Sequence, residues 1–247
     1  NGFAGAIVVD PSGFDDNFLA ISRAPDNRPD NGDEYGLSLK YYSEPLNDTE
    51  FGFYFINHHS RTPIISARTG SNAGVLQAAT TATNLATSGV PAIAAQAGPV
   101  ATDVYAQTAN YFIQYPEDIQ RLGLSFNTQF SGIAFQGEYT FINDAPLQID
   151  DVEILFASLC PINAVLSNAP GINQIDSGCT STGTDQIING FIERNMSQLQ
   201  FTATKLLGPI FMANTGILVG EFGITHVHGM PEKSVLRLNS AGTFVSG

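Results

Sequence analysis

The chain of 247 residues is strongly acidic, with 23 Asp and Glu against 10 Lys and Arg and a formal net charge of −13. This balance would repel nucleic acid phosphates, and no basic stripe offsets it, so nucleic acids are not expected as partners. Hydrophobic residues make up 43% of the chain, yet no run reaches the roughly 18 to 20 apolar residues of a transmembrane helix. Tilted strands of a β-barrel need only about 9 to 11 residues with one apolar face, so that class of membrane protein remains open.

The first 34 residues are a leading segment that ends in an acidic stretch. Residues 1–20 lack the basic head and apolar core of a signal peptide, which indicates a mature chain or a fragment. Residues 26–34 place oxygen donors around a glycine, as calcium loops do, but without the spacing of an EF-hand. Asp26, Asp30 and Asp33 are the candidate calcium ligands, although an ordinary acidic turn in an extracellular loop is the favoured interpretation.

Bulky residues alternate with small or polar residues in three pairs of segments, which is typical of strands with one apolar face. The pairs cover residues 35–42 with 51–56, 121–127 with 133–141, and 198–204 with 218–225. Short links join the members of each pair, near residues 43–50 and 207–215, for example. Residues 62–110 and 142–195 form long connections between pairs. The pattern predicts an all-β, antiparallel domain over residues 1–247, with at least six strands.

The phase of the alternation assigns side chains to two faces. The apolar face is expected to contact lipid through Leu37, Leu39, Phe51, Phe53, Phe55, Leu124, Phe135 and Phe222, together with Tyr35 and Leu122. The opposite face carries Lys40, Arg121, Glu138 and Glu221, which suit a wet lumen better than a solvent-facing sheet. The sequence therefore favours a transmembrane β-barrel of outer-membrane type over a soluble β-sandwich. Since single-chain barrels have at least about eight strands, the chain is expected to be incomplete.

Short periplasmic turns and long extracellular loops characterise outer-membrane barrels, so the long connections are expected outside the cell. Residues 70–108 are rich in small residues and are expected to be mobile or to carry a short helix around residues 73–87. The acidic pair at residues 150–151 predicts a capped short helix over residues 152–157. Cys160 and Cys179 lie in a polar segment, which favours a disulfide over two buried free thiols.

Three stretches resemble an uncharacterised family of proteobacterial outer-membrane β-barrel proteins, known chiefly as a domain of unknown function. They cover residues 46–55, residues 111–119 with 123–128 and 136–139, and residues 220–223 with 225–228. The resemblance implies a large barrel in the outer membrane of a Gram-negative bacterium. It also implies a periplasmic partner and an inner-membrane transporter, and hence export or uptake of hydrophobic compounds. The family supplies no catalytic residues.

The sequence offers little evidence for a chemical site. His58, His59, His226 and His228 end strands near the expected outer rim, but no Cys or carboxylate cluster completes a metal ligand set. A Gly-x-Ser-x-Gly elbow and a phosphate-binding glycine loop are both missing, so no cofactor and no enzyme activity are expected.

Three functions remain open. The leading hypothesis is a conduit for hydrophobic or amphipathic solutes, with the long loops as a lid and with membrane lipid and lipopolysaccharide as neighbours. The alternatives are a structural or surface-interaction barrel and a membrane-embedded hydrolase. A Ser–His pair within hydrogen-bond reach would favour the hydrolase.

Overall fold

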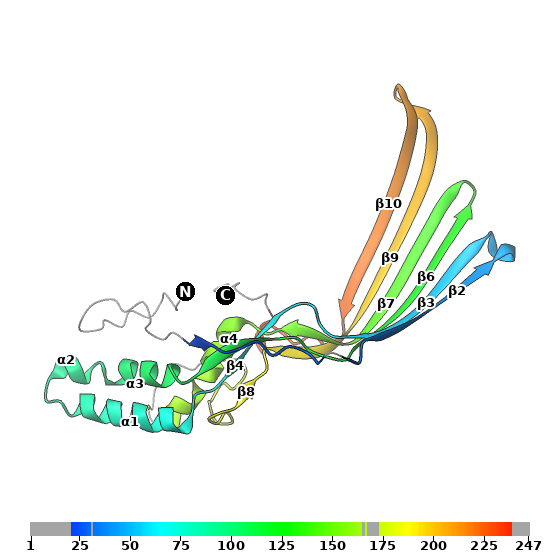
Figure 1. The fold of residues 1–247 in the computed structure, drawn as a ribbon. Coiled ribbons are helices and arrows are strands. Elements are labelled where there is room, and N and C mark those ends of the chain that lie inside the picture. The colour runs from blue at the N-terminus through cyan, green and yellow to red at the C-terminus, as the bar shows by residue number, and fades with distance from the viewer. Residues whose placement is uncertain (1–20, 31, 165, 167–172, 239–247) are drawn as a thin grey trace.

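The computed structural model describes residues 21–30, 32–164, 166 and 173–238, so the expectation for residues 1–20 lies outside the described part of the chain. The all-β prediction is confirmed, because strands build two sheets and helices occur only in the connections (Figure 1). None of the described helices has the length and apolar character needed to cross a membrane.

The larger sheet has six antiparallel strands that neighbour one another in chain order. They are β2 (Tyr35–Ser43), β3 (Thr49–His58), β6 (Ile119–Phe130), β7 (Ile133–Gln148), β9 (Phe191–Ile210) and β10 (Ala213–Val227). The three predicted hairpins are confirmed as β2–β3, β6–β7 and β9–β10, and they fan out from one end of the molecule (Figure 1). Within the described residues the sheet is open, since β2 and β10 each pair on one side only.

At the far end of the sheet, a tight turn joins the two strands of each hairpin. The first contains the 3-10 helix η1 (Glu44–Leu46) and Asn47 in the left-handed region at φ 55°. The β9–β10 turn is shorter than predicted, because the strands continue up to Phe211 and Met212, both at positive φ. Gly208 was expected within this connection but lies in β9, opposite Gly216, where the pairing register shifts. A glycine at positive φ can thus mark an irregularity in strand pairing, as Gly208 does, and not only a turn.

The long connections fold into a compact region, which we call the loop layer. Its sheet has the order β1 (Ser22–Arg23), β5 (Asn110–Gln114), β4 (Ile64–Arg68), β8 (Ile187–Ile188), with β1 parallel to β5. This sheet was not predicted, because strands of two to five residues are too short to show an alternation. The second connection is also shorter than residues 142–195, since β7 and β9 extend into both of its ends.

Helices cover the loop layer. The expected first helix is α1 (Asn72–Ala86), followed by α2 (Pro91–Ala94) and α3 (Ala97–Ala106), and the expected acid-capped helix is α4 (Asp151–Ser158), followed by the 3-10 helix η2 (Cys160–Ala164). Side chains cap both predicted helices: Ser71 accepts a hydrogen bond from the Gly74 amide, and Asp150 accepts one from the Val152 amide. Small residues let α1 and α3 approach closely, and fully buried Tyr105 fills the core beneath them. Burial raises the pKa of the Tyr105 hydroxyl.

A second apolar cluster ties the loop layer to the segment after β10. Buried Ala67, Ile154 and Ile188 come from both long connections, and Leu236 and Leu238 pack against them. Polar contacts reinforce this packing, because the backbone amide of Arg237 donates to the Gln174 side chain and the Arg237 guanidinium pairs with the nearly buried carboxylate of Glu153. The chain thus returns from the tall β9–β10 hairpin to the loop layer.

Gly190 stands where β8 leads into β9 and the two long connections touch. Its amide donates to the hydroxyl of buried Ser66 at 2.8 Å, and its carbonyl accepts from Ile149 at 2.7 Å. A Cβ at this position would overlap the backbone carbonyl of Ile65, which has little freedom to move because the Gln148 side chain holds both polar backbone groups of Ile65. Only glycine fits this approach.

Replacing Gly190 with alanine should therefore lower the free energy of unfolding by about 1–3 kcal/mol or more, as overpacked cores do. Circular dichroism during thermal or denaturant unfolding measures the change. Gly98→Ala in α3 is the matched control, because no atom lies within 4 Å of its added Cβ and alanine is the better helix former. Equal stability of the two variants would contradict the close approach at Gly190.

Candidate functional site

The six-stranded sheet has one apolar and one polar face. One cross-strand row passes through all six strands and carries only bulky residues: Leu39, Phe53, Leu124, Tyr139, Leu199 and Ile224. The register places every predicted lipid-facing residue on this apolar face. Many of these side chains are exposed, and Leu37 keeps 72% and Phe222 57% of its accessible surface. The face is therefore apolar without a covering layer in the described residues.

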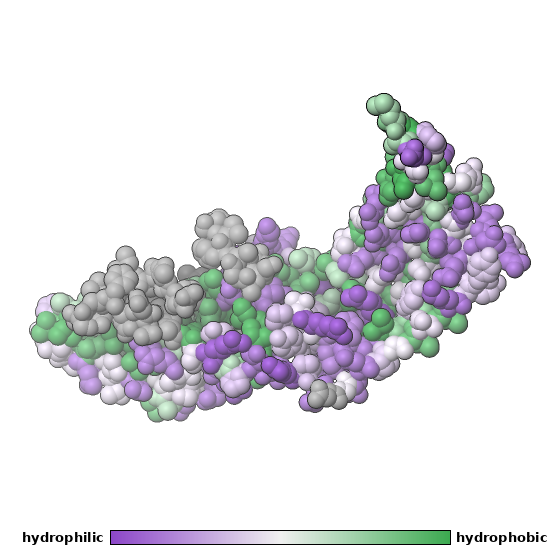
Figure 2. All heavy atoms as spheres, turned by 45° about the horizontal axis from the view of Figure 1, so that its top comes forward, coloured by the Kyte–Doolittle hydropathy of each residue, from purple (hydrophilic) through white to green (hydrophobic). Residues whose placement is uncertain are grey.

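The predicted lumen residues Lys40, Arg121, Glu138 and Glu221 all lie on the opposite, polar face. Hydrophilic residues predominate on the side of the sheet seen in Figure 2, while hydrophobic residues gather at its upper tip. Lys40 and Glu50 form an ion pair at 2.9 Å, and the Gln200 amide donates to the carboxylate of Glu221. Polar groups of neighbouring strands thus satisfy one another at these positions.

A β-bulge ends this polar face next to the loop layer. Ile142 pairs with Met196 and Ala145 pairs with Arg194, so two residues of β7, Asn143 and Asp144, oppose one residue of β9. Asp144 adopts φ 57°, and its amide donates to the Asn195 side chain. Bulges bend strands and increase their twist. Beyond this point β7 and β9 run on into the loop layer (Figure 1).

A pocket of about 670 Å³ lies at this bend. Its wall on the sheet is the cross-strand row formed by Ile56, Arg121, Ile142 and Met196, which belongs to the polar face. The opposite wall comes from residues 60–64, the segment that joins β3 to β4. The pocket therefore lies where the predicted lumen meets the loop layer.

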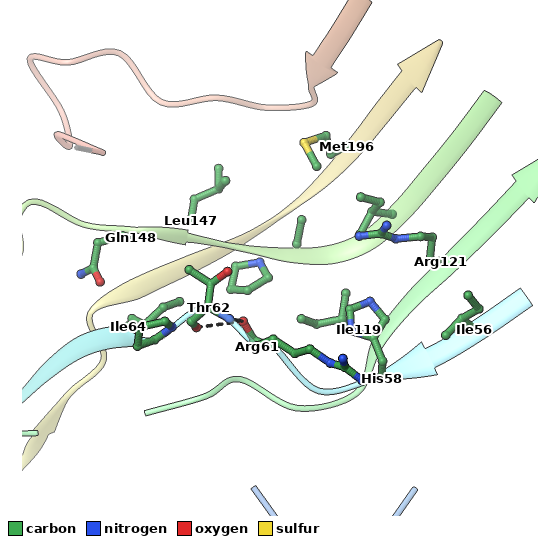
Figure 3. A pocket seen from close by; sticks show the side chains of 15 residues that line it. Ile56, His58, Arg61, Thr62, Ile64, Ile119, Arg121, Leu147, Gln148 and Met196 are labelled. Carbon is green, nitrogen blue, oxygen red and sulfur yellow. Dashed lines mark hydrogen bonds between the residues drawn. The ribbon is translucent and has the colours of Figure 1, made fainter. Parts of the chain in front are cut away.

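Two arginines supply the charge in this pocket, and a histidine lies beside them. Figure 3 shows Arg121 extending from β6 between Ile119 and Met196, while Arg61 approaches from the segment after β3, near His58. The Nε atom of Arg121 is buried and has no hydrogen-bond partner among the described residues. None of the described ion pairs includes Arg121. The sequence assigned Arg121 to this face but gave no signal for Arg61.

The four histidines do not converge on one site. His58 lines the pocket, whereas His59 has a structural role, because its ring contacts the Gly32 carbonyl at 2.7 Å and the Asp118 amide at 3.3 Å. The rings of His226 and His228 meet edge to face, 4.6 Å apart, at the end of β10. In the described part of the chain, no group of three His, Cys, Asp or Glu residues is arranged to hold a metal ion.

The calcium candidates are likewise not assembled into one site. Arg23 forms an ion pair with Asp26 at 2.7 Å, and the backbone carbonyl of Asp33, not its carboxylate, accepts a hydrogen bond from Asn57. Asp30 does not join these residues in a ligand set within the described chain.

A serine and a histidine meet on the apolar face at its loop-layer end. Ser197 Oγ lies 2.9 Å from His228 Nε2 and 3.2 Å from the hydroxyl of Tyr139. This is the distance at which a base can activate a hydroxyl nucleophile. No carboxylate is recorded at the other ring nitrogen of His228 in the described structure, so the third member of a triad is not in place.

A match to a family model shows which protein family the chain belongs to. A family model described as "Protein of unknown function (DUF1302)" matches residues 4–245. The chain belongs to this family. The match confirms the resemblance to an uncharacterised family that the sequence motifs indicated. No curated protein and no solved structure matches the chain, so the roles of residues in this DUF1302 member are argued from its geometry.

The predicted disulfide of this DUF1302 member is confirmed between Cys160 and Cys179. Asp176 orders the same loop, because its carboxylate accepts backbone hydrogen bonds from Thr180, Ser181 and Thr182. Partial burial acts to raise the pKa of Asp176, but these bonds and one from the Thr182 hydroxyl outweigh it and lower the pKa. Next to Cys160, Leu159 and Ile162 pack against α1 and α3.

Replacing both cysteines with serine should lower the free energy of unfolding by about 3 kcal/mol, since the bridge closes a loop over a sequence separation of 19. Denaturant unfolding with and without reductant measures the difference. The chain has 2 cysteines, so reductant should destabilise the wild type and leave the double variant unchanged. A wild type that is insensitive to complete reduction would contradict a stabilising role for the bridge.

Proposed function

We propose that this DUF1302 chain is part of a β-barrel in the outer membrane of a Gram-negative bacterium, which conducts hydrophobic or amphipathic small molecules. The observation that carries the proposal is the opposition of the two faces across all six strands. An exposed apolar face of this extent is a liability in water, and membrane lipid would cover it. The polar face would then line the lumen, as in barrels that hold water or solute.

Strand length supports the same arrangement. The shortest of the six strands, β2, has 9 residues and the longest, β9, has 20. A tilted membrane strand needs about 9 to 11 residues, so each is long enough to span the apolar core of a bilayer. The meander with short turns at one end and long connections at the other is the arrangement of outer-membrane barrels. In such a barrel the turns would lie in the periplasm and the loop layer outside the cell.

The position of the pocket supports transport. It opens on the polar face below the loop layer, where a solute would pass between the outside and the lumen. Its lining is mostly apolar, with Ile119 and Ile142 almost fully buried against Met196. Pockets of this composition bind small hydrophobic molecules and orient them with a few polar groups. A periplasmic partner and an inner-membrane transporter would continue the route.

The contact between Ser197 and His228 favours one second candidate, a membrane-embedded hydrolase. A nucleophile on the apolar face would meet lipid directly. The described part of the chain places no acid beside His228, so this candidate stands behind the conduit.

The membrane arrangement predicts different costs for charge on the two faces. Leu39→Arg should lower the free energy of unfolding in lipid bilayers by about 2–4 kcal/mol, because it places a cation against the hydrocarbon. Ser38→Arg, one residue away on the polar face, should cost about 0–1 kcal/mol. Reversible unfolding in bilayers compares the two variants. Equal losses of unfolding free energy in the two variants would contradict the assignment of Leu39 to the lipid-facing side.

The conduit predicts a transport defect. Deleting the gene from its bacterial host should slow uptake or efflux of some members of a panel of hydrophobic compounds, and a plasmid copy should restore it. A copy carrying Ser197→Ala should restore it equally well, since a conduit needs no nucleophile; failure of this variant alone would favour the hydrolase. Unchanged uptake and efflux across the panel after deletion would overturn the conduit, and the surface-interaction role would then lead.

A further inference from the structure

The charge of the pocket is opposite to that of the chain. The sequence holds 23 acidic residues and only 10 Lys and Arg, yet among the described residues those that line the pocket include Arg61 and Arg121 and no Asp or Glu. Elsewhere on the same face the cation of Lys40 is neutralised by Glu50 at 2.9 Å. The pocket thus keeps its positive charge available for a ligand.

Arg121 in particular lacks an acceptor. Its Nε atom is buried without a hydrogen-bond partner among the described residues. Its cross-strand neighbours on the two adjacent strands are Ile56 and Ile142, neither of which offers a polar side chain. A buried donor of a charged group that stays unpaired is costly, and native proteins rarely leave one. An anionic oxygen in the pocket would satisfy it, and the planar guanidinium suits carboxylate and phosphate oxygens.

The rest of the lining suits a hydrocarbon. Buried Ile119, Ile142 and Ala145 form one apolar cluster with Met196, and Ile64 and Leu147 extend it toward the loop layer. The cations and the apolar cluster share a volume of about 670 Å³, which lies within the usual range of roughly 300 to 1,000 Å³ for small-molecule sites. A ligand here would place a charged end and an apolar end side by side.

From this combination we infer that the pocket binds an amphiphile with one anionic head group, a carboxylate, sulfate or phosphate, on a hydrocarbon tail. Arg121 and Arg61 hold the head, and the cluster around Ile142 and Met196 holds the start of the tail. The inference rests on the proposed conduit and names its solute class. Neutral hydrocarbons bind more weakly at this point of the route, because they leave Arg121 unpaired. Matched alcohols also bind more weakly, because their oxygen can accept a hydrogen bond but carries no negative charge.

Photo-crosslinking tests the site directly. The full chain is placed in nanodiscs of zwitterionic lipid and irradiated with a long-chain carboxylic acid that carries a diazirine near its head group. Mass spectrometry should locate the label within the segments 56–64, 119–121 and 142–148, which contain most of the residues that line the pocket. The unlabelled acid should compete at least about tenfold better than the alcohol of equal length, since the alcohol cannot form an ion pair with the arginines. Equal competition by acid and alcohol would overturn the inference.

Three variants sharpen the test. Arg121→Gln and Arg61→Gln should each reduce labelling about tenfold. Arg61 is exposed, so its variant should fold even if Arg121→Gln does not. Arg68→Gln removes an exposed arginine that lies at the end of β4 outside the pocket, and labelling should be unchanged. The inference would be overturned if Arg61→Gln and any folded Arg121→Gln were both labelled as strongly as the wild type.

Two further arms identify the source of the ligand and separate the two proposals. Phosphatidylglycerol in the nanodisc should suppress labelling if the natural ligand is a membrane lipid, and should leave it intact if the ligand is a free amphiphile; both results support the anionic site. If the protein is labelled specifically but deletion of its gene leaves transport unchanged, the conduit is overturned and the anionic site stands. A transport defect without head-group selectivity would keep the conduit and overturn the site.

Discussion

The ladder between β7 and β9 is the constraint on which the rest of the structure depends. It begins in the six-stranded sheet, passes through the bulge at Asn143 and Asp144, and ends in the loop layer at the pair of Gln148 with Phe191. The two regions therefore share continuous strands. The position of the bulge decides where the polar face bends and hence where the pocket lies. A one-residue insertion in a ladder also reverses which side chains face each side, so it must sit at a fixed point.

The alternation pattern predicted the strands of the large sheet, whereas the composition of the loops predicted only part of the loop layer. The alternation in Leu37 to Tyr41 or Leu122 to Phe126 predicted both the strands and their faces. Side chains with a period of two divide between the same two faces in any register that covers one face. Caps at Asp150 and polar surroundings of Cys160 predicted a helix and a disulfide for local reasons. The loop-layer sheet was missed because its short strands depend on partners far away in the chain. Arg61 was missed because only the folded chain brings residues 60–64 beside β6.

The pocket shows how an acidic protein can hold a local positive charge. Carboxylates on the polar face, such as Glu50 and Glu221, already accept hydrogen bonds from Lys40 and Gln200. The row at the bend instead gives Arg121 two isoleucines as neighbours. The net charge of −13 on the chain would disfavour anions at long range, while the two arginines of the pocket would favour them at contact. Selection at this point would then depend on the apolar tail as well as on the head group.

The small sheet of the loop layer has a consequence for the order of folding. Its strands come from the leading segment and from both long connections, and the bond from the Gly190 amide to the Ser66 hydroxyl joins residues 124 positions apart. Contacts of such high sequence separation form slowly, because a long loop must close before they contribute. The β2–β3, β6–β7 and β9–β10 hairpins are local by comparison. The hairpins should therefore form early, and the loop layer should consolidate only after β9 has paired with β7, so that it is the last described part of the molecule to acquire its structure.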